Sequence, residues 1–205
     1  MDNRTDVVLD AGASVGDFGE KLRESGYAGR IISFEPLSDS YQQLLAVSRL
    51  DGAWQAIHTA VGDHDGEASI NVSGRSTSSS LLPMAATHVD AAPDSAYVSH
   101  ETIAVKRLDT VLKGLIEPND RLYLKIDVQG YEANVLAGAT QTLKVTEVVE
   151  VEVSMVPLYE GSILYAQMIQ TLDALNFHLI SWEDVFTDPQ TGYVLQSDCI
   201  FARRT

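Results

Sequence analysis

The chain has 205 residues, 45% of them apolar, and a formal net charge of −15 at pH 7. This apolar content excludes a disordered chain, and the length suffices for one sizeable hydrophobic core. Lysine and arginine stand side by side only at Lys106–Arg107 and Arg203–Arg204, so the chain lacks the basic clusters that grip a phosphate backbone. We therefore expect no nucleic-acid partner and interpret the charge as a solvated surface.

Three features bear on the compartment. No apolar run approaches the roughly 20 residues that cross a bilayer, so no membrane span is predicted. The polar start at Met1–Asp6 shows no secretory leader. The one cysteine, Cys199, cannot form a disulfide within the chain, which favours a cytoplasmic protein. The sequence leaves the oligomeric state open, with a homodimer among the alternatives.

The first part of the chain alternates strand-like runs with helices. The expected strands are Val7–Leu9, Arg30–Phe34 and Trp54–Val61. The first expected helix is Gly16–Glu24, and the second begins at Ser38 and Asp39, which are good N-caps. This second helix has an apolar side at helical spacing, formed by Tyr41, Leu44, Leu45 and Ser48.

Residues 66–106 break this rhythm. An extra strand is expected at Ala68–Val72, followed by a hydroxyl-rich stretch at Ser73–Ser80. Such a composition is typical of a flexible tether. The stretch also lies between the third and fourth units of the expected sheet, on the side where ligands bind. A lid over the substrate is therefore an equal alternative.

The alternation resumes after the insertion. The expected strands are Leu122–Ile126, Val148–Val153, Phe177–Trp182 and Cys199–Ala202. A helix after the first of these has one apolar side, formed by Val135, Leu136, Ala139 and Leu143. A longer amphipathic helix carries Tyr165, Met168, Ile169, Leu172 and Leu175. A turn at residues 188–192 joins the last two strands.

These elements predict an α/β fold. Near-continuous apolar strands between amphipathic helices indicate a parallel sheet covered on both faces. The last two strands are joined by a short turn, so they form an antiparallel pair. We predict a Rossmann-like, seven-stranded, mostly parallel sheet with helices on both faces and an antiparallel C-terminal strand pair. Residues 1–205 are expected to form a single domain.

Ligands of an open parallel sheet bind outside the carboxyl ends of its strands. After the first strand, Gly12 allows a tight turn and Gly16 opens a helix whose N-terminal amides face the site. Glu35 lies 25 residues after Asp10, at a strand end where a carboxylate can accept both hydroxyls of a ribose. Asp63 ends the third strand, where it either accepts from an adenine amino group or simply forms a turn.

Two cofactors compete for this architecture. A nicotinamide dinucleotide requires Gly-x-Gly-x-x-Gly, but counted from Gly12 the second and third positions hold Ser14 and Asp17. An aspartate beside a pyrophosphate is repulsive, whereas a positive sulfonium tolerates nearby acidic residues such as Asp10 and Asp127. The turn therefore favours S-adenosylmethionine.

Several short motifs occur in order between residues 6 and 159. They are Asp10-Ala-Gly-Ala-Ser-Val-Gly16, Ser33-Phe-Glu-Pro36, Ala60-Val-Gly-Asp63, Ser78-Ser-Ser-Leu-Leu82, Leu108-Asp-Thr110, Leu124-Lys-Ile-Asp-Val-Gln-Gly-Tyr-Glu132, Leu136-Ala-Gly-Ala139 and Pro157-Leu-Tyr159. Together they resemble the motifs of FkbM-type methyltransferases. The resemblance implies O-methylation of a hydroxyl in a sugar, glycolipid or secondary metabolite, which would be a small-molecule or glycan acceptor.

The strand ends and the resemblance together assign a cofactor site. Its expected members are Asp10, Gly12, Ala13, Gly16, Glu35, Asp63 and Asp127. The sequence departs from the family pattern in one respect. Family members commonly carry a longer segment before the first motif, whereas about six residues precede the first strand in this sequence. That departure leaves the acceptor specificity open.

The residues expected to act in the reaction end the fourth strand. Lys125 and Asp127 point to the same face by strand alternation, so an ion pair is expected. Asp127 could then accept or orient the acceptor hydroxyl, and proton removal adds about 10²–10⁴-fold to such a step. A purely structural strand-end pair is the alternative. His100 is a further catalytic candidate in the acceptor pocket, with simple solvent exposure as its alternative.

Other candidates follow from chemistry alone. Glu132, Glu150 and Glu152 could hold a divalent cation with Asp127, but no spacing rule supports it and no metal ligand is assigned. Tyr159 either walls a sugar site or packs in the core.

The favoured function is a methyltransferase. A nicotinamide-dependent reductase and a catalytically silent nucleotide-binding or scaffold protein are the alternatives.

Overall fold

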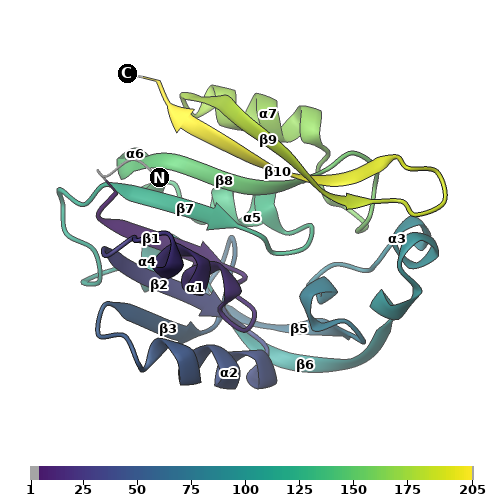
Figure 1. Cartoon of the computed structure of the whole chain (residues 1–205), viewed down its shortest axis with the longest axis horizontal. Coiled ribbons are helices and arrows are strands. Elements are labelled where there is room, and N and C mark those ends of the chain that lie inside the picture. The colour runs from purple at the N-terminus through teal and green to yellow at the C-terminus, as the bar shows by residue number, and fades with distance from the viewer. Residues whose placement is uncertain (1–4, 205) are drawn as a thin grey trace.

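The structure is a computed structural model that describes residues 5–204, so most of the polar start considered above lies outside the described residues. Seven strands form one sheet: β1 (Val7–Ala11), β2 (Arg30–Glu35), β3 (Trp54–His58), β7 (Leu122–Ile126), β8 (Thr146–Ser154), β9 (Phe177–Thr187) and β10 (Val194–Arg203). Their order is β3-β2-β1-β7-β8-β10-β9 (Figure 1). β10 is antiparallel to both neighbours and the other pairs are parallel, which confirms the predicted sheet.

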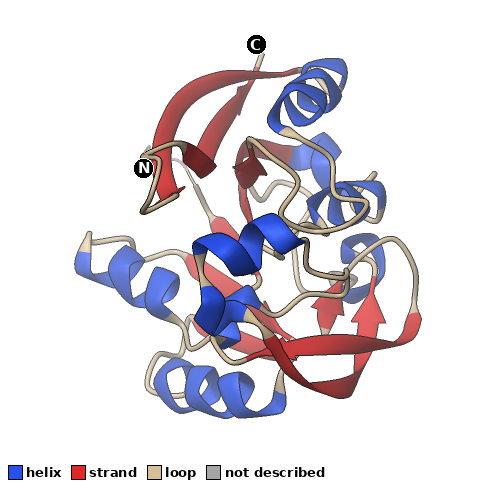
Figure 2. Cartoon of the chain, turned by 90° about the vertical axis from the view of Figure 1, so that its right-hand side faces the viewer, coloured by secondary structure: helices blue, strands red, loops and turns tan. Residues whose placement is uncertain are grey.

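Helices cover both faces of this sheet (Figure 2). One face is covered by α1 (Asp17–Glu24) and α2 (Ser38–Ser48). The other face is covered by α4 (Leu108–Val111), α5 (Glu132–Ala137), α6 (Thr142–Val145) and α7 (Tyr165–Ala174). Within residues 5–204, no helix has the length and apolar character needed to span a bilayer.

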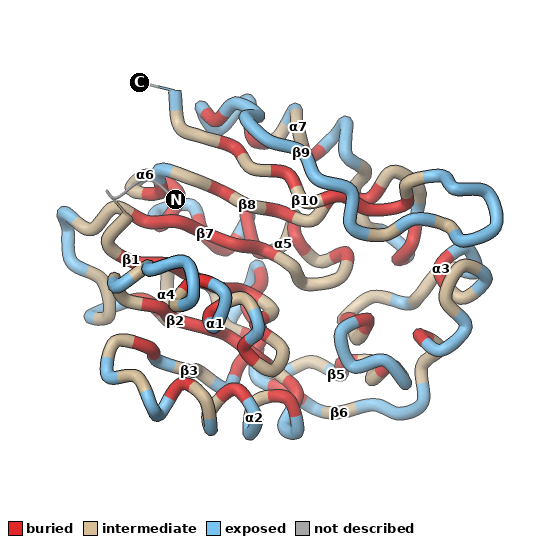
Figure 3. Tube along the Cα trace, in the orientation of Figure 1, coloured by how far each residue is buried: buried red, intermediate tan, exposed pale blue. Residues whose placement is uncertain are grey.

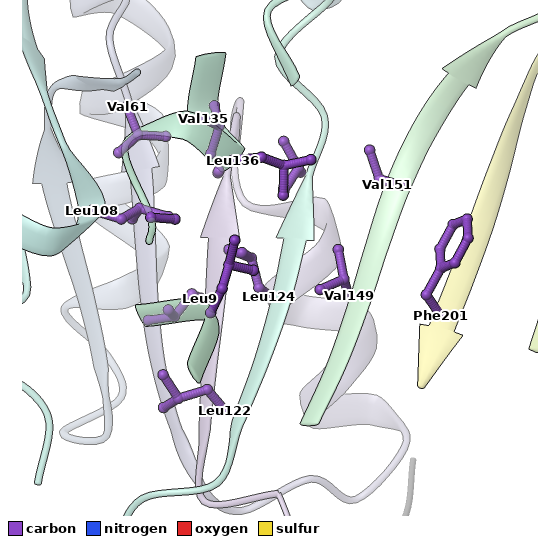
Figure 4. Packing of buried hydrophobic residues seen from close by; sticks show 14 of the residues in the cluster. Leu9, Val61, Leu108, Leu122, Leu124, Val135, Leu136, Val149, Val151 and Phe201 are labelled. Carbon is purple, nitrogen blue, oxygen red and sulfur yellow. The ribbon is translucent and has the colours of Figure 1, made fainter. Parts of the chain in front are cut away.

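The main core lies between the central strands and the second helix layer. Leu9, Leu124 and Val149 project from three adjacent strands toward Val135 and Leu136 of α5 (Figure 4). β1 and β7 are buried along their whole length, whereas β9 at the sheet edge is mostly exposed (Figure 3). Strands buried on both faces read as continuous apolar runs, which is why their positions could be predicted.

The segment between β3 and β7 builds a smaller sheet with the order β4-β6-β5. Its strands are β4 (Ala60–Val61), β5 (Gly66–Ser73) and β6 (Tyr97–Lys106). The 3₁₀ helices η1 (Ser76–Ser78) and η2 (Pro93–Ser95) and the short helix α3 (Ala86–Ala91) connect β5 to β6. In Figure 1 this unit lies beyond the ends toward which the arrows of β1, β2 and β7 point. That is the edge of the large sheet where ligands are expected.

The third strand is shorter than predicted. β3 ends at His58, which pairs with Glu35 at the end of β2. With no further residue of β2 to pair with, Ala60–Val61 joins the end of β6 instead. Asp63 therefore follows a strand of the small sheet, and its predicted place at an end of the large sheet is wrong.

The single helix predicted after β7 is divided into α5 and α6. Asp109 explains the division, because its carboxylate accepts hydrogen bonds from the backbone N–H groups of Gln141, at 3.0 Å, and Thr142, at 2.8 Å. This carboxylate caps the start of a new helix. The predicted apolar positions are buried nevertheless: Val135, Leu136, Ala139 and Leu143.

The residues expected to cap α2 have another role. Leu37 is the N-cap, and Ser38 is already helical. The Ser38 hydroxyl donates to Glu101 at 2.5 Å, which ties α2 to β6. His100 and Glu101 both lie inside β6.

Candidate functional site

The carboxyl ends of β1, β2 and β7 open onto a cavity of about 700 Å³, here called the first cavity. Much of its wall is apolar, including Phe34, Leu37, Val61, Ile70 and Leu81. Polar groups converge on it from Ser14, Glu35 and Asp127. An apolar cavity with a few placed polar groups is typical of a small-molecule or cofactor site.

Glycines shape the turn between β1 and α1. Gly12 lines the first cavity and has a φ of 86°, and a Cβ there would lie 1.8 Å from the carbonyl oxygen of Asp127. Only glycine fits this close approach of two strand ends. Gly16, with a φ of 105°, is the N-cap of α1 and packs toward Leu44 and Trp54. Of these two glycines, therefore, Gly12 is the one at the cavity wall.

Glu35 is buried at the end of β2 and lines the first cavity. Its Oε2 accepts from the backbone N–H of Ser14 and its Oε1 from that of Leu37, both at 2.8 Å. Burial raises the pKa of Glu35 to about 7, although these two N–H groups lower it. The side chain connects the β1–α1 turn to the start of α2, and each oxygen keeps a lone pair for a ligand hydroxyl.

The predicted ion pair of Lys125 and Asp127 is confirmed, with 3.1 Å between Nζ and Oδ2. Burial lowers the pKa of Lys125, but Asp127 and Asp10 outweigh this effect and raise it above its ordinary range. Asp10 is completely buried, and burial raises its pKa to about 6 while Lys125 opposes the rise. One cation thus compensates two carboxylates beside the strand ends.

A second cavity of about 590 Å³ adjoins the first. Three residues line both cavities, and they are Thr77, Asp127 and Gln129. The wall of the second cavity is rich in polar side chains, including Arg75, Ser78, His88, Ser95, Glu152 and Gln196. The two cavities therefore differ in chemistry and meet at Asp127.

The hydroxyl-rich stretch lies over the junction of the cavities. Ser76, Ser79 and Ser80 line the first cavity, and Thr77 lines both. Ser80 Oγ donates to the carbonyl of Gln129 at 2.6 Å. This contact holds the stretch against the loop that follows β7.

Asp63 and His100, two of the predicted site residues, are exposed away from both cavity walls. Asp63 is exposed and accepts from Asn134 Nδ2 at 2.9 Å, because the early end of β3 moves it away from the ligand edge. His100 is exposed on β6. There the strand register places its neighbour Glu101, and not His100, opposite the cavity residue Ile70.

Three other predicted residues also lie behind the cavity walls. Asp10 and Ala13 are buried in the turn region next to Gly12. Tyr159 is fully buried and packs against Gly130, so it does not wall an open sugar site. Its hydroxyl donates to Gln129 Oε1 at 2.6 Å, which supports the wall from behind.

The carboxylates considered for a cation are already engaged by the protein. Glu132 accepts from the backbone N–H groups of Val128, at 3.2 Å, and Gly130, at 2.9 Å. Glu150 accepts from the Tyr123 hydroxyl. In the described part of the chain, no group of three or more His, Cys, Asp or Glu side chains is arranged to hold a metal ion.

Sequence reasoning missed several cavity residues. Gln129 had a usable signal, because it follows Asp127 by two residues and precedes Gly130 in a strand-end turn. His88 and Gln196 offered none, because α3 and β10 reach the second cavity only through the tertiary fold.

Comparisons with known proteins agree with this geometry. A family model described as Methyltransferase FkbM domain matches residues 10–179. The crystal structure of a methyltransferase FkbM from Methylobacillus flagellatus KT matches 97% of this chain with a TM-score of 0.54 and 14% identity. This chain spans 44% of that protein. No protein of curated function matches the chain.

Two structures with bound S-adenosyl-L-methionine share the fold. Fibrillarin from Aeropyrum pernix has a TM-score of 0.54 at 15% identity, over 97% of this chain and 67% of its own. The magnesium protoporphyrin IX methyltransferase of Synechocystis PCC 6803 has a TM-score of 0.52 at 8% identity, over 98% of this chain and 71% of its own. At these identities the likeness shows the fold alone.

The sheet order, the glycine turn and the family match define the fold and family class of S-adenosylmethionine-dependent methyltransferases. The match extends over most of the chain, from the end of β1 into β9. The chain belongs to the FkbM methyltransferase family. This membership sets aside the nicotinamide-dependent reductase.

Proposed function

We propose that the protein methylates a hydroxyl of a sugar, glycolipid or secondary metabolite. The proposal rests on one observation: the largely apolar first cavity meets the polar second cavity at Asp127. The first cavity suits a nucleoside cofactor and the second suits a polar acceptor. The acidic chain disfavours a nucleic acid as that acceptor.

The first cavity fits S-adenosylmethionine chemically. Phe34 and Val61 offer apolar surface to an adenine ring, and Glu35 has lone pairs for ribose hydroxyls. The carboxylate of Asp127 suits a positively charged group, with Asp10 behind it. When bound, S-adenosylmethionine supplies an electrophilic methyl group on a positively charged sulfur.

The protein's own residues position the acceptor. An alcohol is a weak nucleophile, so its orientation and the removal of its proton decide the rate. We assign Asp127 to orient the hydroxyl, with Lys125 fixing the carboxylate through the ion pair. We assign Ser73–Thr87 to a lid that closes over both ligands, because its hydroxyl groups line both cavities.

Calorimetry and methyl transfer test the proposal. S-adenosylhomocysteine should bind the full chain, while NADPH should give no binding heat. Radiolabelled S-adenosylmethionine should then label the oxygen of a neutral glycoside in a panel of methyl glucosides, galactosides, mannosides and rhamnosides. Label that appears only on amines or on carbon would contradict O-methylation and leave the cofactor assignment intact.

A further inference from the structure

Glu152 has an arrangement suited to accepting a proton. It lies on β8 and lines the second cavity. Its Oε2 accepts from Gln129 Nε2 at 2.9 Å and from Gln196 Nε2 at 2.5 Å. Its Oε1 accepts no hydrogen bond from any of residues 5–204. The carboxylate is thus held by one oxygen, and the other is available to a ligand.

Gln129 orients the carboxylate of Glu152 through its side-chain amide. Its backbone has a φ of 55°, an uncommon conformation for a residue other than glycine that recurs at functional sites. The Tyr159 hydroxyl donates to Gln129 Oε1 at 2.6 Å, which orients the amide. Gln129 Nε2 therefore faces both Asp127, at 2.8 Å, and Glu152. One amide connects the two carboxylates.

The two carboxylates differ in charge compensation. Asp127 pairs with Lys125 at 3.1 Å and also accepts from Gln129, so both of its oxygens are engaged. Glu152 receives two neutral amide donors and forms no ion pair within the described chain. A partly buried carboxylate without a counter-ion holds a proton more readily than a paired one. Glu152 is therefore the better proton acceptor of the two.

The surroundings of Glu152 reinforce this difference. Burial raises the pKa of Glu152 well above its ordinary range. The neighbouring carboxylates of Asp127, Glu132 and Asp198 raise this pKa further. The ammonium group of Lys125 opposes the rise. A general base is most effective when its pKa lies near the working pH. A raised pKa moves a glutamate toward neutral pH.

The rest of the second cavity offers bonding groups to a neutral, hydroxyl-bearing ligand. Arg75 and His88 are its other titratable members. Burial lowers the pKa of His88, so its ring is uncharged at neutral pH. His88 Nδ1 is buried and has no partner among residues 5–204. A ligand carboxylate would be repelled by Asp127 and Glu152, so the cavity favours a neutral ligand.

We propose that Glu152 takes the proton of an acceptor hydroxyl bound in the second cavity, with Gln129 as the positioning residue. The proposal rests on the proposed function. The step balances as follows: the acceptor oxygen gains the methyl group and loses its proton to Glu152 Oε1, and the electron pair of the broken carbon–sulfur bond stays on sulfur. Asp127 orients the hydroxyl during this step.

Glu152→Gln tests this role, because glutamine keeps the size of the side chain and cannot take the proton. Turnover of the labelled glycoside should fall about 10²-fold or more, and S-adenosylhomocysteine affinity should stay within about twofold. Wild-type turnover should rise with pH as Glu152 ionises, and the variant should lose this rise. Glu147→Gln, on the exposed start of the same strand, is the matched control and should keep wild-type turnover.

A second measurement needs no acceptor. In protein carrying ¹³C-labelled glutamate, the carboxyl resonance that Glu152→Gln removes should titrate well above the ordinary glutamate pKa of about 4.3. Gln129→Leu should raise this pKa further, because it removes a donor to the ionised form. Titration in the ordinary range, or wild-type turnover in folded Glu152→Gln, overturns the proposal. Failure of the wild-type chain to bind S-adenosylhomocysteine would instead refute the proposed function.

Discussion

Replacing Glu35 by glutamine is the most direct test of the cofactor site. The carboxylate accepts two backbone N–H groups, from Ser14 and Leu37, and lines the first cavity. Glutamine has one acceptor oxygen, so its amide N–H₂ must face one of these N–H groups. Both the ligand contact and the turn geometry are therefore perturbed by a single substitution.

The size of the effect follows from these contacts. A hydrogen bond from a ribose hydroxyl to a charged acceptor contributes about 1–3 kcal/mol, which corresponds to a roughly 5–150-fold weaker affinity when it is lost. A buried N–H group left without its acceptor costs about 1–3 kcal/mol of folding free energy. We expect a weaker complex with S-adenosylhomocysteine and a lower melting temperature in the same variant.

Calorimetric titration with S-adenosylhomocysteine, after a melting curve that confirms folding, measures both effects. Asp63→Asn is the matched control, because its carboxylate accepts from Asn134 outside the cavity walls. This control should keep wild-type affinity. Unchanged affinity in folded Glu35→Gln would remove Glu35 from the cofactor site.

The remaining predictions address chemistry, motion and pH. Asp127→Asn should reduce turnover by about 10²-fold or more, because the hydroxyl loses its orienting carboxylate, and should change little the affinity for S-adenosylhomocysteine, whose sulfur is uncharged. A lower melting temperature with unchanged turnover would leave only a structural role. Hydrogen exchange in Ser73–Thr87 should be slower with cofactor and acceptor than with cofactor alone, and equal exchange would refute the lid. Burial raises the pKa of Glu35 and Glu132 from 4.5 to about 7, so the folded state binds more protons in that interval. Their contribution to folding stability is present below pH 4.5 and is lost as the pH rises through 7. The melting temperature of the free protein should therefore fall between pH 4.5 and 7. A rise in the melting temperature over that range would contradict this prediction.

Much of the sheet could be predicted because its central strands are buried on both faces. β7 was predicted with its observed bounds, Leu122–Ile126, and β1 and β2 were each predicted to within two residues. The ends of such strands carry the turn and the acidic residues, so Gly12, Glu35 and Asp127 were correctly placed at one edge. Their common edge follows from parallel topology alone.

What the sequence could not predict depends on contacts between distant segments. Asp63 follows a strand that leaves the large sheet for β6, and no local pattern marks that change of partner. His100 and Glu101 are adjacent, and only the pairing with β5 decides which of them is opposite a cavity residue. The second cavity combines side chains of η1, α3, β8 and β10, so its chemistry appears only when the chain is folded.

The interpretation of the acidity also changes with the structure. A solvated surface accounts for part of the charge, but Asp10, Glu35 and Glu132 are buried. Among residues 5–204, Lys125 is the single buried lysine or arginine. The protein alone therefore leaves these carboxyl groups with raised pKa values, at a cost in stability when they ionise. Under the proposed function, a positively charged methyl donor in the first cavity would therefore favour the ionised forms of these groups more than the neutral product would.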